Sequence, residues 1–339
     1  MNTLNYIGCK NKLFSIILDV MKENVPDLSS KSFSDLFMGT GIVSYQMLEH
    51  CRSVSSNDLE SYSYVIGNAL LKCNYSDSLS AHIDICNSLP EVEGLIYKYY
   101  SVNEESERMF FTSSNAKKAD AVRIYIEKQR PHLSPSEYYF LLASLLVSLD
   151  KVANTACVYG AYLKKFKKSA EKPLVIEAIH QKRDIRVEEN QMTQEFAEQV
   201  EVKSDVTYLD PPYNQRSYSA NYFVLNFVVR YDSNVVPRGK TGLIDKNQSD
   251  FCSKRNVEQA FSELLDNIGS RYIFLSYNNE GLLSQEKMRR MLEKKGSVKL
   301  YKILYNKFKA QKNVDGDHVY EFLWVIDTQS PSSFQELER

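Results

Sequence analysis

The sequence predicts an α/β fold in which a mostly helical lobe is inserted into a Rossmann-like sheet. Residues 32–57 have the pattern of strand, glycine-rich turn, helix and strand, the unit from which a doubly wound parallel sheet is built. From about Pro90 to Val200 long polar stretches replace this rhythm. The rhythm resumes at Asp205–Asp210, an apolar strand that ends in a carboxylate. We therefore expect the middle of the chain to leave the sheet and return to it.

Each element of the first half of the sheet follows from local patterns. A helix is predicted at about 11–24, a short strand at Ser32–Phe37 and a helix at Ile42–His50. Ser53–Asn57 is predicted as the next strand and Leu59–Leu71 as the helix after it. This order is expected to place the two strands side by side and parallel.

The second half is predicted in the same way. Arg271–Tyr277 is a buried strand by its continuous apolar run, and Gln285–Lys295 is a helix. Ser297–Tyr305 and Val319–Ile326 are separated by a segment that contains an Asp-Gly turn signal, so they are predicted to form a closing antiparallel hairpin. In the middle region, Tyr138–Leu149 is apolar without strand alternation and is expected to be helical.

These elements divide the chain into four parts. The first half of the sheet domain is expected at 1–88, the inserted lobe at 89–200 and the second half of the sheet domain at 201–330. Residues 331–339 are polar, with one proline and two serines, and are predicted to be a flexible, frayed tail.

Composition excludes several classes of protein. The chain has 339 residues with 43% hydrophobic and 25% charged side chains, which is typical of a folded globular protein. It contains neither a signal-peptide pattern nor a run of eighteen apolar residues, so a cytoplasmic location without membrane attachment is expected. Its six cysteines lack metal-ligand spacing, so no metal site is expected. The net charge of −1 means that any nucleic-acid binding requires segregated basic patches.

The most informative motif is Asp-Pro-Pro-Tyr at residues 210–213. A strand delivers Asp210 to the carboxyl edge of the sheet, where open α/β folds bind ligands. Pro211 and Pro212 then hold a rigid turn that lacks two backbone donors and presents carbonyl acceptors. If the Asp210 carboxylate and the Pro211 carbonyl accept both hydrogens of an aromatic amine, they favour the tetrahedral nitrogen geometry that frees its lone pair. Tyr213 offers a flat face on which an extruded base can stack. The alternative is a purely structural turn with Tyr213 as packing.

A second motif, Asp35-Leu-Phe-Met-Gly-Thr-Gly41, runs from a strand through a glycine turn into a helix. Gly39 and Gly41 permit close approach of the backbone to a ligand, with Asp35 and Phe37 beside them. The alternative is a tight turn without a ligand. Asp58 ends the next strand, at the position from which an acid binds ribose hydroxyls in nucleotide-binding folds, so a nucleoside cofactor is predicted.

Basic residues form two stretches. The run at Lys164, Lys165, Lys167 and Lys168 is interpreted as a phosphate-contacting patch in the lobe, and its alternative is a solvated face. Further basic residues are assigned to DNA contacts around and after Asp-Pro-Pro-Tyr: Arg216, Arg238, Lys240, Lys307 and Lys309. Gly239-Lys240-Thr241 is not a nucleotide-triphosphate loop, because the glycine five residues earlier is missing and no strand leads into it.

The order of these motifs resembles the alpha group of DNA adenine methyltransferases. The resemblance also includes Tyr6-Ile-Gly-Cys-Lys10, and the segments VANTACVYGAYLK and IFLSYNNEG, so it covers nearly the whole chain. It implies a Rossmann-like methyltransferase sheet that binds S-adenosylmethionine, and a lobe that recognises double-stranded DNA. It also implies that a restriction endonuclease accompanies the enzyme. The methyltransferase itself is expected to be a monomer or weak dimer.

The resemblance further implies roles for individual residues. Tyr6 and Lys10 would contact the adenine and methionine ends of the cofactor, Phe37, Gly39 and Gly41 would shape its pocket, and Asp58 would hold its ribose, with Asp35 and Asp210 beside it. Asn190 matches the position from which family members contact the amine of the cofactor's adenine. The implied reaction is direct transfer to a base flipped out of the duplex.

Three alternatives stay open at this stage. Methylation of the cytosine exocyclic amine is the same chemistry on a similar group, and RNA could replace DNA as the substrate. A catalytically silent DNA-binding subunit is the alternative from outside the enzymes. Methylation of a cytosine ring carbon is disfavoured, because none of the six cysteines follows a proline.

Overall fold

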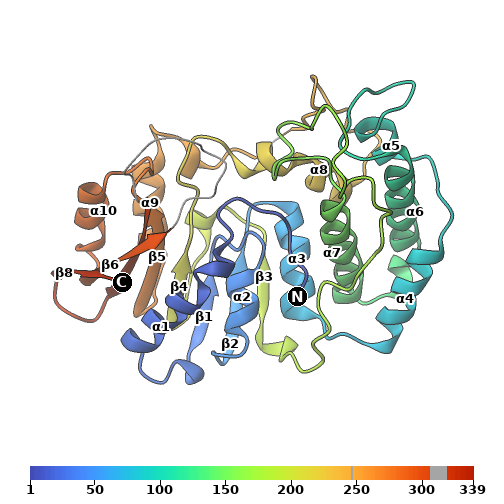
Figure 1. Cartoon of the computed structure of the whole chain (residues 1–339). Helices are drawn as coiled ribbons and strands as arrows, with labels where there is room; N and C mark the ends of the chain where they lie inside the picture. Colours follow the sequence, from blue (N-terminus) through green and yellow to red (C-terminus); the bar gives the residue numbers. More distant parts are fainter. Residues whose placement is uncertain (246, 306–318) are drawn as a thin grey trace.

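The computed structural model describes residues 1–245, 247–305 and 319–339, and within them eight strands form a single mixed sheet (Figure 1). The strand order is β3-β2-β1-β4-β5-β7-β6-β8. The first five strands in this order are parallel, and β7 is antiparallel to both β5 and β6. The strands are β1 Ser32–Asp35, β2 Ser53–Asn57, β3 Gln191–Thr193, β4 Val206–Leu209, β5 Tyr272–Asn278, β6 Ser297–Tyr305, β7 Val319–Asp327 and β8 Ser333–Glu338. The predicted α/β fold is confirmed.

Helices cover the sheet and build the lobe beyond it (Figure 1). The helices are α1 Phe14–Asn24, α2 Ile42–Met47, α3 Ser61–Lys72, α4 Asp77–Ser88, α5 Leu95–Tyr100, α6 Ser113–Gln129, α7 Pro135–Lys151, α8 Tyr218–Arg230, α9 Val257–Asp266 and α10 Gln285–Leu292. The lobe contains α4 to α7 and so begins before residue 89, earlier than predicted, and α7 packs against α3. One hydrophobic core runs from the sheet through α3 into the lobe.

Alternation along the strands separates the two faces of the sheet. Tyr208 contributes to the large core shared with α1, α3 and the lobe, and its neighbour Leu209 contributes to a second core under α9 and α10. Because successive side chains of a strand point to opposite faces, a short apolar strand such as β4 supplies both cores. Asp210, the next residue, then stands at the carboxyl edge.

Several predictions need correction. The tail at 331–339 is not frayed, because Ser333–Glu338 forms β8 and pairs in parallel with β6. The two predicted hairpin strands pair antiparallel as β6 and β7, and the predicted turn between them lies outside the described residues. β7 also pairs with β5 and so lies between β5 and β6. β3 falls inside the predicted lobe yet pairs with β2. Helix α8, whose residues 221–228 are all buried, was not predicted.

Two further features concern the region after β4. Helix α8 is broken by Tyr222, whose φ of −126° and ψ of 23° are not helical. The carbonyl of Asn221 accepts a hydrogen bond from the backbone of Tyr159 in the lobe, at 2.7 Å. The kink therefore joins the segment after Asp-Pro-Pro-Tyr to the lobe. No helix in the described parts of the chain is long and apolar enough to span a membrane.

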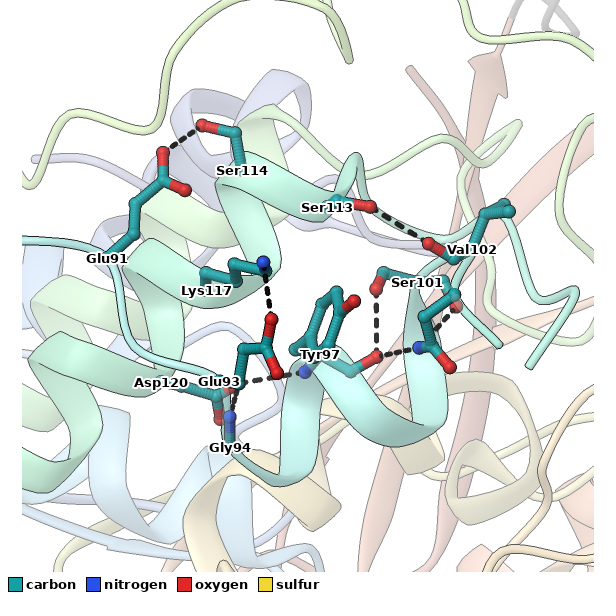
Figure 2. Close-up of polar contacts among 11 residues, drawn as sticks. Glu91, Glu93, Gly94, Tyr97, Ser101, Val102, Ser113, Ser114, Lys117 and Asp120 are labelled. Atoms are coloured by element: carbon teal, nitrogen blue, oxygen red, sulfur yellow. Dashed lines mark hydrogen bonds and ion pairs between the residues drawn. The ribbon is translucent and has the colours of Figure 1, made fainter. Parts of the chain in front are cut away.

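Asp120 organises the start of α5 (Figure 2). Its carboxylate accepts backbone hydrogen bonds from Gly94, Ile96 and Tyr97 at 3.1, 2.9 and 2.8 Å, and the hydroxyl of Tyr231 donates to it at 2.6 Å. The side chain is fully buried. A buried carboxylate is stable only with such donors, so Asp120 fixes α5 to α6 and to the end of α8.

Replacing Asp120 by alanine should lower the free energy of unfolding by roughly 2–4 kcal/mol, because several buried donors lose their acceptor together. Denaturant titration would measure this. Glu93→Gln is the matched control, since Glu93 forms an exposed ion pair with Lys117 beside Asp120 (Figure 2). That pair is screened by water, so the control should keep the parental stability. Equal stabilities of the two variants would contradict the role assigned to Asp120.

Candidate active site

A pocket opens at the carboxyl edge of β1, β2 and β4. Its lining comes from segments 6–10, 35–43, 57–60, 195–198, 208–218 and 247–252. In parallel sheets the carboxyl ends of neighbouring strands meet at one edge, which explains why residues so distant in sequence share one pocket. The predicted residues Tyr6, Lys10, Asp35, Phe37, Gly39, Asp58, Asp210 and Pro212 all line it.

The glycine turn forms one wall. Gly39 and Gly41 have φ values of 55° and 76°, a region that side chains other than glycine rarely adopt. A Cβ atom on Gly41 would lie 2.6 Å from Leu70, and one on Gly39 would lie 3.2 Å from the ring of Tyr6. Gly41 is therefore required by packing behind the wall, whereas Gly39 leaves room in the pocket itself. Helix α2 after the turn ends at Met47, earlier than predicted.

One half-buried carboxyl group, Asp58, and one buried carboxyl group, Asp35, support this turn. Asp58 accepts hydrogen bonds from the backbone of Gly39 at 2.7 Å and of Glu60 at 2.9 Å. Asp35 accepts from the hydroxyl of Ser44 at 2.7 Å. Burial raises the pKa of Asp58 to about 6 and that of Asp35 to about 7. Each oxygen of Asp58 keeps a second lone pair, so it can still accept a hydrogen bond from a ligand.

Lys10 connects three distant parts of the chain. Its ammonium lies 2.9 Å from Asp210 and 3.0 Å from Glu321 of β7, and only 6% of the lysine side chain is exposed. Burial lowers the pKa of Lys10, but the charges of Asp210 and Glu321 outweigh this and hold that pKa well above its usual value. Burial raises the pKa of Asp210 to about 6, against the lowering effect of Lys10.

The Asp-Pro-Pro-Tyr turn continues from β4. Pro211 is buried, and Pro212 lines the pocket beside Asp210. Tyr213 is half-buried against the core under α9 and α10, and its carbonyl accepts from the backbone of Leu282 at 3.2 Å. Pro211, Tyr213 and Gly41 do not line the pocket itself.

Tyrosines form another wall of the pocket. The ring of Tyr6 stacks on both Tyr218 and Tyr222, with centroids 5.2 and 4.5 Å away and interplanar angles of 14° and 18°, and the Tyr218 and Tyr222 rings lie 6.2 Å from each other. Its hydroxyl lies 2.9 Å from that of Tyr62. Stacking of this kind favours a rigid wall. The N-terminal segment is therefore fixed against α8, next to Asp210.

Sequence reasoning missed several residues of the site. Glu60 is buried in the pocket wall and accepts hydrogen bonds from Asn226 at 2.6 Å and Ser219 at 3.1 Å, both on α8. Glu195 and Glu198 line the pocket after β3. Acids after a strand are the usual signal, but β3 has only three residues and no apolar run. Glu321 lies in an apolar strand far from the other motifs.

Asn190 lies away from the pocket, which corrects its predicted role. Its side chain accepts from the backbone of Val54 at 2.9 Å and donates to the carbonyl of Leu71 at 3.1 Å. It precedes β3 and so stands at the amino end of a strand whose carboxyl end faces the pocket. Asn190 comes before β3, whereas the pocket-lining Glu195 and Glu198 come after it.

The predicted DNA-binding residues are placed as follows. Lys164, Lys165 and Lys168 are exposed, while Lys167 donates to the carbonyl of Thr155 at 2.7 Å and so also supports the lobe. Arg216 is exposed and lines a second pocket with Ile7 and Tyr218, next to the first. Arg238 and Lys240 are exposed on a turn held by Arg108, which donates to the carbonyls of Gly239 and Lys240. Lys307 and Lys309 lie outside the described residues.

Comparison with known proteins identifies the family to which this chain belongs. Residues 6–291 match the family described as D12 class N6 adenine-specific DNA methyltransferase. The chain belongs to this family. It is 43% identical to the type II methyltransferase M.NlaIII of Neisseria lactamica over 96% of this chain and 99% of the relative. It is 39% identical to the type II methyltransferase M.CviAII of Paramecium bursaria Chlorella virus 1, again over 96% and 99%.

The D12-class assignment confirms the resemblance drawn from the motifs. The protein is an adenine-specific DNA methyltransferase, which decides between the adenine and cytosine amines. A longer relative, the type II methyltransferase M.FokI of Planomicrobium okeanokoites, is 31% identical over 99% of this chain but 55% of its own length. Among residues 1–245, 247–305 and 319–339 no cluster of three His, Cys, Asp or Glu side chains could hold a metal ion.

Asn190→Ala tests the corrected position of this residue. It would leave the amide of Val54 and the carbonyl of Leu71 buried without partners, so the free energy of unfolding should fall by about 1–3 kcal/mol. The methylation rate well below the melting temperature should keep its parental value. Calorimetry of unfolding and a methyl-transfer assay would measure the two quantities. A large loss of cofactor affinity with normal stability would restore the original assignment.

Proposed function

We propose that the enzyme binds S-adenosylmethionine in the pocket beside the glycine turn and methylates adenine in duplex DNA as the modification partner of a restriction endonuclease. The observation that carries this proposal is that Asp210 and the glycine turn with Asp58 line one pocket. The names of the type II relatives support the pairing with an endonuclease. As expected from the sequence, we propose that the enzyme acts as a monomer or weak dimer.

The residues present fit a nucleoside cofactor. Gly39 leaves space that a Cβ would fill, and Asp58 has acceptor capacity for ribose hydroxyls. Lys10 uses two of its three N–H groups on Asp210 and Glu321 and keeps one for a carboxylate. Glu195 or Glu198 would accept from the adenine amine in place of Asn190. When bound, S-adenosylmethionine supplies an activated methyl group.

Asp210 and the carbonyl of Pro211 are the proposed acceptors for the target amine. One oxygen of Asp210 bonds Lys10, and the other has no hydrogen-bond partner in the described part of the chain. That oxygen is free to accept an amine hydrogen, which would leave the amine's lone pair available for the methyl group that the bound cofactor would supply as its carbon–sulfur bond breaks. The proton released from the amine then passes to Asp210 or to water. Asp210 must be ionised to accept, so activity should decline as the pH falls through about 6.

Duplex binding is proposed to use the exposed basic residues on both sides of the pocket. Lys164, Lys165 and Lys168 lie on the lobe, and Arg238 and Lys240 lie on the turn held by Arg108. Cationic side chains at such positions contact phosphates and set register without reading sequence. Tyr213 is proposed to stack on the flipped base.

Asp210→Ala should reduce methyl transfer to duplex DNA by at least about 10²-fold, as when one partner of a transition state is removed. The assay is incorporation of labelled methyl groups followed by nucleoside analysis, which also identifies the methylated base. Cofactor affinity, measured by calorimetry, should change little, since Asp58 and the glycine turn remain. Near-parental transfer by this variant would refute the role of Asp210. Label on RNA in preference to duplex DNA would refute the substrate.

Comparing Tyr213→Phe with Tyr213→Ala separates the ring from the hydroxyl. Phenylalanine keeps the stacking face and should retain most activity, whereas alanine loses roughly 1–3 kcal/mol of base stacking. A mismatch opposite the target adenine lowers the energy needed for extrusion, so it should partly rescue the alanine variant. Steady-state rates on matched and mismatched duplexes would show this. Equal damage from both substitutions would mean that the hydroxyl is the functional group.

A further inference from the structure

Glu321 occupies an unusual position on β7. It lies on the same strand face as Leu323 and Val325, both of which are buried in the large core. Glu321 itself is only 15% exposed. A carboxylate on such a face is costly unless it is paired, and its ion-pair partner is Lys10 at 3.0 Å. An apolar residue at this position would continue the core. We therefore attribute the carboxylate at this position to its ion pair with Lys10.

Lys10 has two carboxylate partners at nearly equal distances, 2.9 and 3.0 Å. If Lys10 were paired with Asp210 alone, one positive charge would neutralise one negative charge. With Glu321 ionised the three groups carry a net charge of −1, and the ammonium is shared. Asp210 then remains a stronger acceptor than it would be in an isolated ion pair.

We propose that Glu321 is a positioning residue for methyl transfer, which acts through Lys10 to leave Asp210 only partly neutralised and with one oxygen free for the target amine. This inference rests on the proposed role of Asp210. Glu321 does not touch the substrate in this account. It fixes Lys10 from the side of β7, so that Lys10 engages a single oxygen of Asp210.

Within the described part of the chain, titratable groups from several elements contribute to the charge balance around Asp210. The groups that face it are Lys10 from the N-terminal segment, Glu321 from β7, Asp35 from β1, Tyr208 from β4, Tyr213 from the turn and Tyr218 from α8. The tyrosines are neutral at physiological pH. Lys10 favours the ionised form of Asp210, and the negative charge of Glu321 opposes it. Removing Glu321 should therefore lower the pKa of Asp210, and removing Lys10 should raise it.

The test is the titration of the Asp210 carboxyl by carbon-13 NMR in the cofactor-free protein, assigned with Asp210→Asn, together with steady-state kinetics. In Glu321→Gln the titration midpoint should move to lower pH. Its kcat at pH 8 should fall roughly 10-fold, the lower end for loss of a residue that orients a functional group, with an unchanged KM for DNA. Glu321→Asp should show smaller changes in the same directions. In Lys10→Met the midpoint should move to higher pH, and adding Glu321→Gln should have little further effect on kcat.

Asp327→Asn is the matched control, because it removes a carboxylate from the far end of the same strand, where Asp327 pairs with the exposed Arg271. It should move neither the midpoint nor kcat. An unchanged midpoint and kcat in folded Glu321→Gln would overturn the inference, and so would full additivity with Lys10→Met. If Glu321→Gln does not fold, Glu321→Asp decides by the same two measurements. If Asp210→Asn methylates DNA at the parental rate, the role of Asp210 fails instead.

Discussion

One buried ammonium group holds the site together. Lys10 comes from the first residues of the described chain, Asp210 from the middle of the sheet and Glu321 from β7. Each carboxylate would be expensive to bury alone, and Lys10 would be expensive without them. The three elements that carry these side chains therefore meet at Lys10, and two of the three residues, Lys10 and Asp210, line the pocket.

The rest of the architecture places the other pocket residues around Lys10 and Asp210. Parallel strands β1, β2 and β4 deliver Asp35, Asp58 and Asp210 to one edge, and the glycine turn bends the chain away before it would fill the pocket. The stacked tyrosines then fix the N-terminal segment against α8. The broken helix α8 in turn carries the hydrogen bond to the lobe. The glycine turn, the Asp-Pro-Pro-Tyr turn and the lobe are thus linked by a short chain of direct contacts.

Sequence alone predicted those parts of the site whose residues form a local pattern. Asp-Pro-Pro-Tyr and the glycine turn each combine a strand with special backbone residues, and both line or flank the pocket. Asn190 was misplaced because β3 is three residues long and carries no apolar signal, so its two ends could not be told apart. Glu321 could not be found from the sequence, because its ion-pair partner Lys10 is more than three hundred residues away in the chain. The strand β8 was missed because its outward side chains are as polar as those of a loop.

Strand β8 also bears on how the molecule behaves in a crowded solution. Without it, β6 would present a nine-residue row of unpaired backbone groups at the border of the sheet, the type of surface on which a second copy could add a strand. β8 covers residues 297–302 of that row, and β8 itself carries the exposed side chains of Gln335, Glu336 and Glu338. Carboxylates at a border disfavour stacking with another negatively charged border. The last segment of the described chain thus protects the sheet against self-association, a task unrelated to chemistry on DNA.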